Sequence, residues 1–168
     1  LEHGAEVNAA DASGNTPICA AAACGGAAGK KVVRLLLERG AVLQASGTNG
    51  STTALHAAAG AGAVDTLKLL LRRPGVDVHA RDSQGRTLLF RAASAGANGL
   101  PAYRALLEDG VDKKVVDNEG RTLLHAAAAA PDGGDVVRSL LDDTDFMEWL
   151  QTLAASSDQS SSESFTGW

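Results

Sequence analysis

Four similar blocks of apolar residues divide the chain. Each block opens on a threonine, continues with a stretch rich in alanine and leucine, and later reaches a pair of leucines. The threonines stand 37, 34 and 35 residues apart, at Thr16, Thr53, Thr87 and Thr122. The leucine pairs are Leu36-Leu37, Leu70-Leu71, Leu106-Leu107 and Leu140-Leu141. Because apolar residues spaced three or four apart share one face of a helix, we expect two helices per block.

Local chemistry supports this prediction. Threonine favours the N-cap of a helix, because its hydroxyl accepts a hydrogen bond from an unpaired backbone N–H of the first turn. Pro17 suits the first helical position, where no N–H is needed. The alanine runs at 57–59 and 126–130 favour helix and let neighbouring helices approach closely. A single pair of such helices cannot bury its apolar face alone, so the recurrence predicts a stack of mutually covering blocks.

The block openings carry a family pattern. They read GNTPICAAA, STTALHAAA, GRTLLFRAA and GRTLLHAAA, and an aspartate stands five residues before the threonine in three of them. Three blocks then end in a glycine-containing turn, whereas the fourth runs into DDTDFMEWLQTL. Over residues 1–143 this pattern resembles the ankyrin repeat. The resemblance implies an all-α, helix-turn-helix solenoid with short, hairpin-like turn tips.

The pattern also predicts how the chain is divided. Residues 1–10 resemble the end of a preceding repeat, and the chain begins with Leu1 instead of Met, so we expect a piece of a longer protein. Asp145 and Glu148 have the spacing of a capping box, which predicts a C-terminal capping helix at 144–155. The acidic, serine-rich residues 156–168 are expected to be disordered. The four repeats are expected at 11–47, 48–81, 82–116 and 117–143.

Composition limits the class of function. The net charge is −5, and residues 139–168 carry six acidic side chains and no basic one, so the remainder is nearly neutral. A nucleic-acid-binding surface is therefore not expected. No apolar run reaches the ~18 residues of a membrane helix. The two cysteines are too few for a disulfide scaffold, which favours an intracellular location, cytoplasmic or nuclear.

The residues that could suggest catalysis have simpler explanations. His56 and His125 each follow a threonine, Thr53 and Thr122, by three residues, and we interpret these pairs as structural ties at the starts of helices. The segment CGGAAGKK lacks the first glycine and the hydroxyl residue of a phosphate-binding loop. The cysteines lack a second pair of metal ligands. We therefore expect no enzyme activity and no cofactor.

The ankyrin resemblance implies a partner protein on the concave side of the stack. The position after the histidine slot should face this side, and it holds Ala20, Ala57, Arg91 and Ala126, so most of the floor is small. Arginines in the third and fourth repeats would suit an extended acidic or phosphorylated peptide. The alternative is that these arginines are scattered, solvated charges. The candidate partner-binding residues are Asn15, Asn49, Arg81, Arg86, Arg91, Ser94, Asn118 and Arg121.

The segment after the fourth repeat has two interpretations. Phe146, Trp149, Leu150 and Leu153 share one helical face, which could pack on Leu140 and Leu141 and seal the stack. Alternatively, this acidic, aromatic segment docks in a groove of the coactivator type, as in a transcription-regulatory module. Our main prediction is a protein–protein interaction module, a scaffold or targeting unit.

Overall fold

The computed structural model describes residues 6–12, 14–43 and 53–162, with side chains as far as Ser156. Within these ranges the chain forms helices and no strand, which confirms the predicted all-α fold. The helices are α1 (Pro17–Ala23), α2 (Gly26–Glu38), α3 (Ala54–Gly60), α4 (Val64–Leu71), α5 (Leu88–Ser94), α6 (Leu100–Glu108), α7 (Leu123–Ala128), α8 (Gly134–Leu141) and α9 (Thr144–Ser162).

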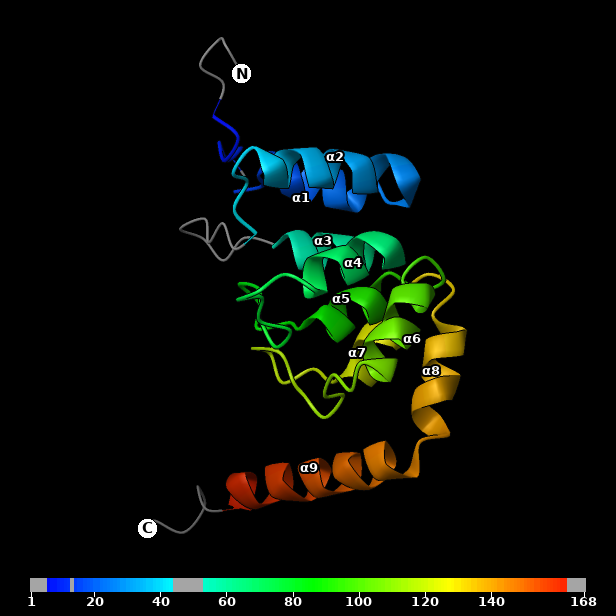
Figure 1. Ribbon diagram of the computed structural model, residues 1–168. Helices are drawn as coiled ribbons and strands as arrows, with labels where there is room; N and C mark the ends of the chain where they lie inside the picture. Colours follow the sequence, from blue (N-terminus) through cyan, green and yellow to red (C-terminus); the bar gives the residue numbers. More distant parts are fainter. Residues whose placement is uncertain (1–5, 13, 44–52, 163–168) are drawn as a thin grey trace, which may run out of the picture.

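The helices stack in layers (Figure 1). The first helices of the four repeats, α1, α3, α5 and α7, pack side by side in one row, and α2, α4 and α6 pack in a second row. α8 packs on α7 but is turned relative to the outer row, and α9 crosses the end of the stack (Figure 1). The architecture is therefore an elongated solenoid, as the repeat pattern predicted.

Small and medium-sized apolar side chains form one continuous core through the layers. The second residues of the first three inner helices, Ile18, Leu55 and Leu89, are all buried between adjacent repeats. Alanines on the same helices are also buried, which lets the inner helices lie close together. The largest fully buried side chains are Tyr103, Phe90 and Phe146. Because each layer is one helix pair thick, much of the core packing joins two neighbouring repeats.

The three tips that the structure describes are short turns closed in the same way. The N–H groups of Asp11, Asp82 and Asp117 donate to the carbonyl oxygens of Asn15, Arg86 and Arg121 at 2.9, 3.0 and 3.0 Å. In the last tip an isolated antiparallel bridge also joins Val116 to Thr122. These bonds give the tips the hairpin-like form that the resemblance implied. Each of the four threonines predicted as N-caps stands at the N-cap of its helix, but the predicted bond to the hydroxyl is not general. Thr53 accepts from the His56 N–H, whereas Thr16 and Thr87 make no side-chain cap hydrogen bond.

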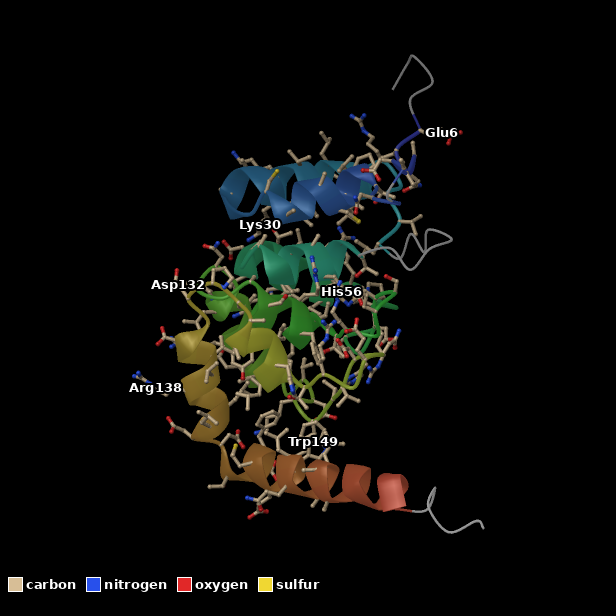
Figure 2. All side chains as sticks on the ribbon, turned by 180° about the vertical axis from the view of Figure 1, so that it is seen from behind. Glu6, Lys30, His56, Asp132, Arg138 and Trp149 are labelled. Carbon is tan, nitrogen blue, oxygen red and sulfur yellow. The ribbon has the colours of Figure 1, made fainter. Side chains whose placement is uncertain are left out.

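α9 seals part of the open end of the stack. Phe146 is fully buried, its ring lies 5.5 Å from that of Trp149, and Figure 2 shows Trp149 on the side of α9 that faces the repeats. Two ion pairs, Lys113 with Asp143 and Lys114 with Asp145, fix the beginning of α9 to the preceding tip. These contacts favour the sealing interpretation over a free docking helix.

Two details of this end differ from the sequence-based expectation. Leu141, which we expected under the cap, is 49% exposed, because Phe146 packs with Leu140 and leaves the next side chain outside. The helix also runs to Ser162, beyond the expected end at residue 155, and so includes the first part of the segment 156–168. Serine tolerates helix when an established helix precedes it, and Ser156 donates to the carbonyl of Leu153.

The connections between paired helices also touch each other along the stack. A Cβ atom on Gly62 would lie 1.8 Å from the carbonyl oxygen of Asn98, and one on Gly96 would lie 1.8 Å from that of Pro131. Both glycines have positive φ, 64° and 59°. Only glycine therefore fits these two contacts between adjacent repeats.

These contacts predict an unequal response to the same substitution. Gly62→Ala and Gly96→Ala should each lower the free energy of unfolding by about 2–5 kcal/mol, from left-handed strain plus a steric clash. Gly110→Ala is the control, because φ is 75° there and the new Cβ would meet nothing within 4 Å. It should cost only about 1–2 kcal/mol. Urea denaturation of the three variants measures the difference, and equal losses would contradict the packing role.

The sealing role of α9 gives a second prediction. Phe146→Ala should lower the free energy of unfolding by about 3–5 kcal/mol, because it removes a fully buried aromatic ring. Leu141→Ala, which truncates a half-exposed side chain of the same end, should have a much smaller effect. Trp149 fluorescence should shift to the red in the Phe146 variant. An unshifted spectrum with unchanged stability would mean that α9 does not seal the stack.

Candidate partner-binding groove

A groove runs across the inner helices of the first three repeats. Its volume is about 640 Å³, and α1, α3 and α5 each contribute residues to it. The floor is made of small side chains, among them Ala20, Ala57 and Ala61. Arg91 and Ser94 line one part of the groove, and Asp11 and Asn15 line another. The alanines leave the floor open enough for a main chain to lie against it.

A second hollow continues the groove into the fourth repeat. It has a volume of about 170 Å³, lies over α5 and α7, and is lined by Arg86, Arg121 and Ala126 among others. Ser94 lines both hollows, so the two form one path along the row of inner helices. The residues that follow the histidine slot in the four repeats therefore lie along the same path, as the sequence pattern predicted. They are Ala20, Ala57, Arg91 and Ala126.

Two of the predicted arginines are already paired within their own tips. Arg86 donates from Nε to Asp82 Oδ2 at 2.8 Å, and its Nη2 lies 2.8 Å from the same oxygen. Arg121 donates from Nε to Asp117 Oδ2, also at 2.8 Å. Each aspartate further accepts backbone N–H bonds from its own tip. These two guanidinium groups hold the tips together, and Arg121 Nη1 also lies 3.4 Å from Glu119 Oε2.

The pKa values of the two aspartates reflect this pairing. Burial raises the pKa of Asp82, but the hydrogen bonds from the Arg86 side chain and backbone outweigh it, so the net pKa lies below the usual value. At Asp117, burial is again opposed by hydrogen bonds from Arg121, first from its backbone, and the pKa is lowered. Both aspartates are therefore ionised and complete their ion pairs at neutral pH.

Arg91 differs from the other groove arginines. Its Nε is buried without a hydrogen-bond partner, and within the described residues no carboxylate forms an ion pair with it. Its side chain reaches over Gly60, where an added Cβ would lie 3.8 Å from Nη2. Burial, and then the nearby positive charge of Arg86, lower the pKa of Arg91, while Asp82 partly offsets this. Arg91 is thus a cation that lines the groove without an ion pair among the described residues.

The remaining predicted partner residues lie in different places. Arg81 is not part of the groove lining: its Nη1 donates to the carbonyls of Gly85 and Val116, which joins two neighbouring tips. Asn118 donates to the carbonyl of Ser83 and likewise connects tips. Asn15 lines the groove near Asp11, which accepts its backbone N–H. Asn49 lies outside the described residues.

The threonine–histidine pairs lie within hydrogen-bonding distance. Thr53 Oγ1 is 2.8 Å from His56 Nδ1, and Thr122 Oγ1 is 2.9 Å from His125 Nδ1. His56 Nε2 lies 3.1 Å from the carbonyl of Arg86, in the next repeat. A carbonyl only accepts, so Nε2 carries the proton and Nδ1 of the neutral ring accepts from the Thr53 hydroxyl. His56 therefore joins its own helix start to the next tip.

The third repeat shows what happens when the histidine is absent. Phe90 fills the same buried slot and has no polar atom, and the Thr87 hydroxyl is left buried without a partner. Phe90 therefore stabilises this slot by burial of its apolar ring alone, without the hydrogen bonds that a histidine makes there. In the first repeat, Cys19 Sγ lies 3.4 Å from Thr16 Oγ1.

No described group of His, Cys, Asp or Glu side chains has the arrangement of a metal site. Among the described helices, none is both long and apolar enough to cross a membrane.

Comparison with known proteins agrees with this architecture. A family model described as "Ankyrin repeats (3 copies)" matches residues 1–82 and again residues 64–148. The chain belongs to the ankyrin-repeat family. Members of this family are generally protein–protein interaction modules. A search of curated proteins found no match to the chain.

Sequence reasoning missed the aspartates that hold the groove arginines. Asp82 and Asp117 each precede their arginine by four residues in the segments DSQGR and DNEGR. The repeated Asp before the threonine was visible, but its pairing with the arginine of the same tip follows only from the turn geometry. Sequence reasoning also missed Gly60, which lines the groove beneath the Arg91 side chain. A glycine at the end of an alanine-rich helix could have indicated this space.

Burial of His56 predicts a pH dependence of stability. Desolvation, the largest cause, lowers the pKa of His56 from 6.5, more than its hydrogen bond to Arg86 raises it. Below pH 6.5 the unfolded chain takes up a proton that the folded chain resists, so the free energy of unfolding falls as pH falls towards the folded-state pKa. His56→Phe, which copies the third repeat, should remove this dependence.

Urea denaturation of both proteins between pH 7.5 and 5 measures this difference. The other histidines are present in both proteins and cancel in the comparison. The lowered pKa values of Asp82 and Asp117 act only at lower pH, since these carboxylates start from 3.8. Parallel pH profiles of the wild type and the variant would rule out the proposed titration of His56.

Proposed function

We propose that this chain binds an extended segment of a partner protein along the groove formed by α1, α3, α5 and α7. The observation that carries the proposal is the continuous path joined at Ser94, with alanine at three of its four floor positions. A small floor admits a main chain, while the tips and Arg91 supply polar contacts beside it. This is peptide recognition by a preformed surface, with little ordering cost for the solenoid.

Arg91 supports an acidic partner segment. A guanidinium group binds carboxylate or phosphate oxygens through forked, charge-assisted hydrogen bonds, and Arg91 lines the groove without an ion pair among the described residues. Arg86 adds to the positive potential, although its own pairing with Asp82 limits its role. We therefore assign the acidic contact mainly to Arg91 instead of to an arginine stripe. An aspartate, a glutamate or a phosphorylated side chain of the partner would satisfy it.

The contacts of α9 argue against the transcription-regulatory alternative. It required the aromatic face of α9 to be available to a partner, but Phe146 is fully buried and Trp149 lies against the core. A scaffold or targeting role that uses the groove requires no such rearrangement.

Arg91→Ala tests the proposal. It should weaken partner binding by about 10- to 100-fold, because it removes a charged hydrogen bond. It should leave the free energy of unfolding unchanged or raise it by up to ~1 kcal/mol, since alanine occupies this position in the other repeats. Arg104→Ala, an exposed change on α6, is the matched control and should affect neither quantity.

The partner is captured by site-specific photo-crosslinking in cell extract. A benzoylphenylalanine at Ala61, an exposed position that lines the groove, should form protein adducts whose yield falls when Arg91→Ala is added. The same label at Glu38, exposed on α2, is the control and should form none of them. Adducts that are equal at both positions, or insensitive to Arg91, would contradict groove binding.

A further inference from the structure

The path along the inner helices does not stop at the fourth repeat. A third hollow of about 500 Å³ lies between the last tip and α9. Val116, Gly120 and His125 line it on one side, and Leu150, Leu153 and Ala154 line it on the other. His125 also lines the second hollow of the groove, so the groove opens into this space. We call it the terminal wedge.

The terminal wedge occupies the place that the next tip fills elsewhere in the stack. In the second repeat His56 Nε2 donates to the backbone carbonyl of Arg86, from the next tip. In the third repeat an added Cβ on Gly85 would meet Asn118 of the next tip at 2.1 Å, whereas one on Gly120, in the last tip, would meet nothing within 4 Å. The last repeat therefore presents the same docking surface for an extended backbone, without a tip on it.

His125 supplies the hydrogen-bond donor of this surface. The Thr122 N–H donates to His125 Nδ1 at 3.2 Å, so the neutral ring carries its proton on Nε2. Among the described residues Nε2 has no acceptor of the kind that His56 finds in Arg86. A main-chain carbonyl passing through the wedge would be such an acceptor. The wall opposite His125, made by Leu150 and Leu153, is apolar.

We propose that the partner segment bound in the groove continues past His125 and inserts one large apolar side chain into the terminal wedge. The inference rests on the proposed function and specifies the partner further: it carries an acidic residue for Arg91 and an apolar residue for Leu150 and Leu153. Continuity through His125 is the reason for choosing the same segment as the occupant of both places.

The spacing of these two partner residues follows from the layer geometry. Packed helices lie about 8–10 Å apart, and the wedge lies between one and two layers beyond the helix that carries Arg91, or roughly 8–20 Å. An extended chain covers about 3.3 Å per residue, so about two to six residues separate the acidic and the apolar side chain.

Selection of peptides tests this inference directly. Random 12-residue peptides displayed on phage are selected on the full chain, and enriched sequences are examined for an acidic and a large apolar residue at that separation. Leu153→Asp should remove the apolar preference and weaken a selected peptide by about 10- to 100-fold, while the acidic preference remains. Arg91→Ala should remove the acidic preference and leave the apolar preference in place. Gln151→Asp adds the same charge to an exposed position of α9 outside the wedge and should behave as the wild type.

The outcomes separate the two proposals. No enrichment on the wild type would overturn both, whereas acidic enrichment alone, unchanged by Leu153→Asp, would overturn only the terminal wedge. Leu153 is not among the side chains packed on the core, so circular dichroism of its variant should match the wild type. A dimer dissolved by Leu153→Asp, or apolar enrichment only after removal of residues 163–168, would assign the wedge to a second copy or to the chain's own end, and would overturn the inference.

Discussion

The structure depends on one constraint: each repeat is too thin to bury its apolar surface alone and needs the neighbouring repeats to cover the rest. The second helices of the four repeats show this most clearly. Val32 of α2 is 46% exposed, whereas the side chains at the corresponding position of the next three repeats, Thr66, Ala102 and Val136, are at most 1% exposed. The residue type alone does not decide burial here, because a threonine is covered and a valine is not. The presence of a preceding layer decides it.

The same constraint explains why several polar bonds of this protein run between repeats. His56 reaches from one repeat to the next tip, Arg81 joins two tips, and Asn118 bonds to the tip before its own. A thin layer has little interior of its own, so its buried hydrogen-bond donors pair with acceptors in the neighbouring repeat. Tip geometry is then set jointly by two repeats, and the groove beside the tips is preformed.

Much of the fold could be predicted from the sequence, since threonine N-caps, alanine runs and leucine pairs are local signals that agree with each other. The sequence could not show which arginines lack an ion pair. Arg86 and Arg91 look alike in the sequence and differ only in whether a turn brings an aspartate beside them. Arg81 was misplaced for the same reason. At the end of the stack, the burial of Leu140 and the exposure of Leu141 depend on the angle at which α9 leaves α8, and no local pattern encodes that angle.

Arg91 is the point where the scaffold and the proposed site conflict. A buried Nε without an acceptor costs about 1–3 kcal/mol relative to a satisfied one, and an alanine at this position would avoid that cost, as it does in the other three repeats. A solenoid selected for stability alone would have no use for this arginine. Exceptions to local consistency are expected where a surface binds something. The departure of Arg91 from an otherwise repeated floor is therefore an argument for recognition, and it is independent of the shape of the groove.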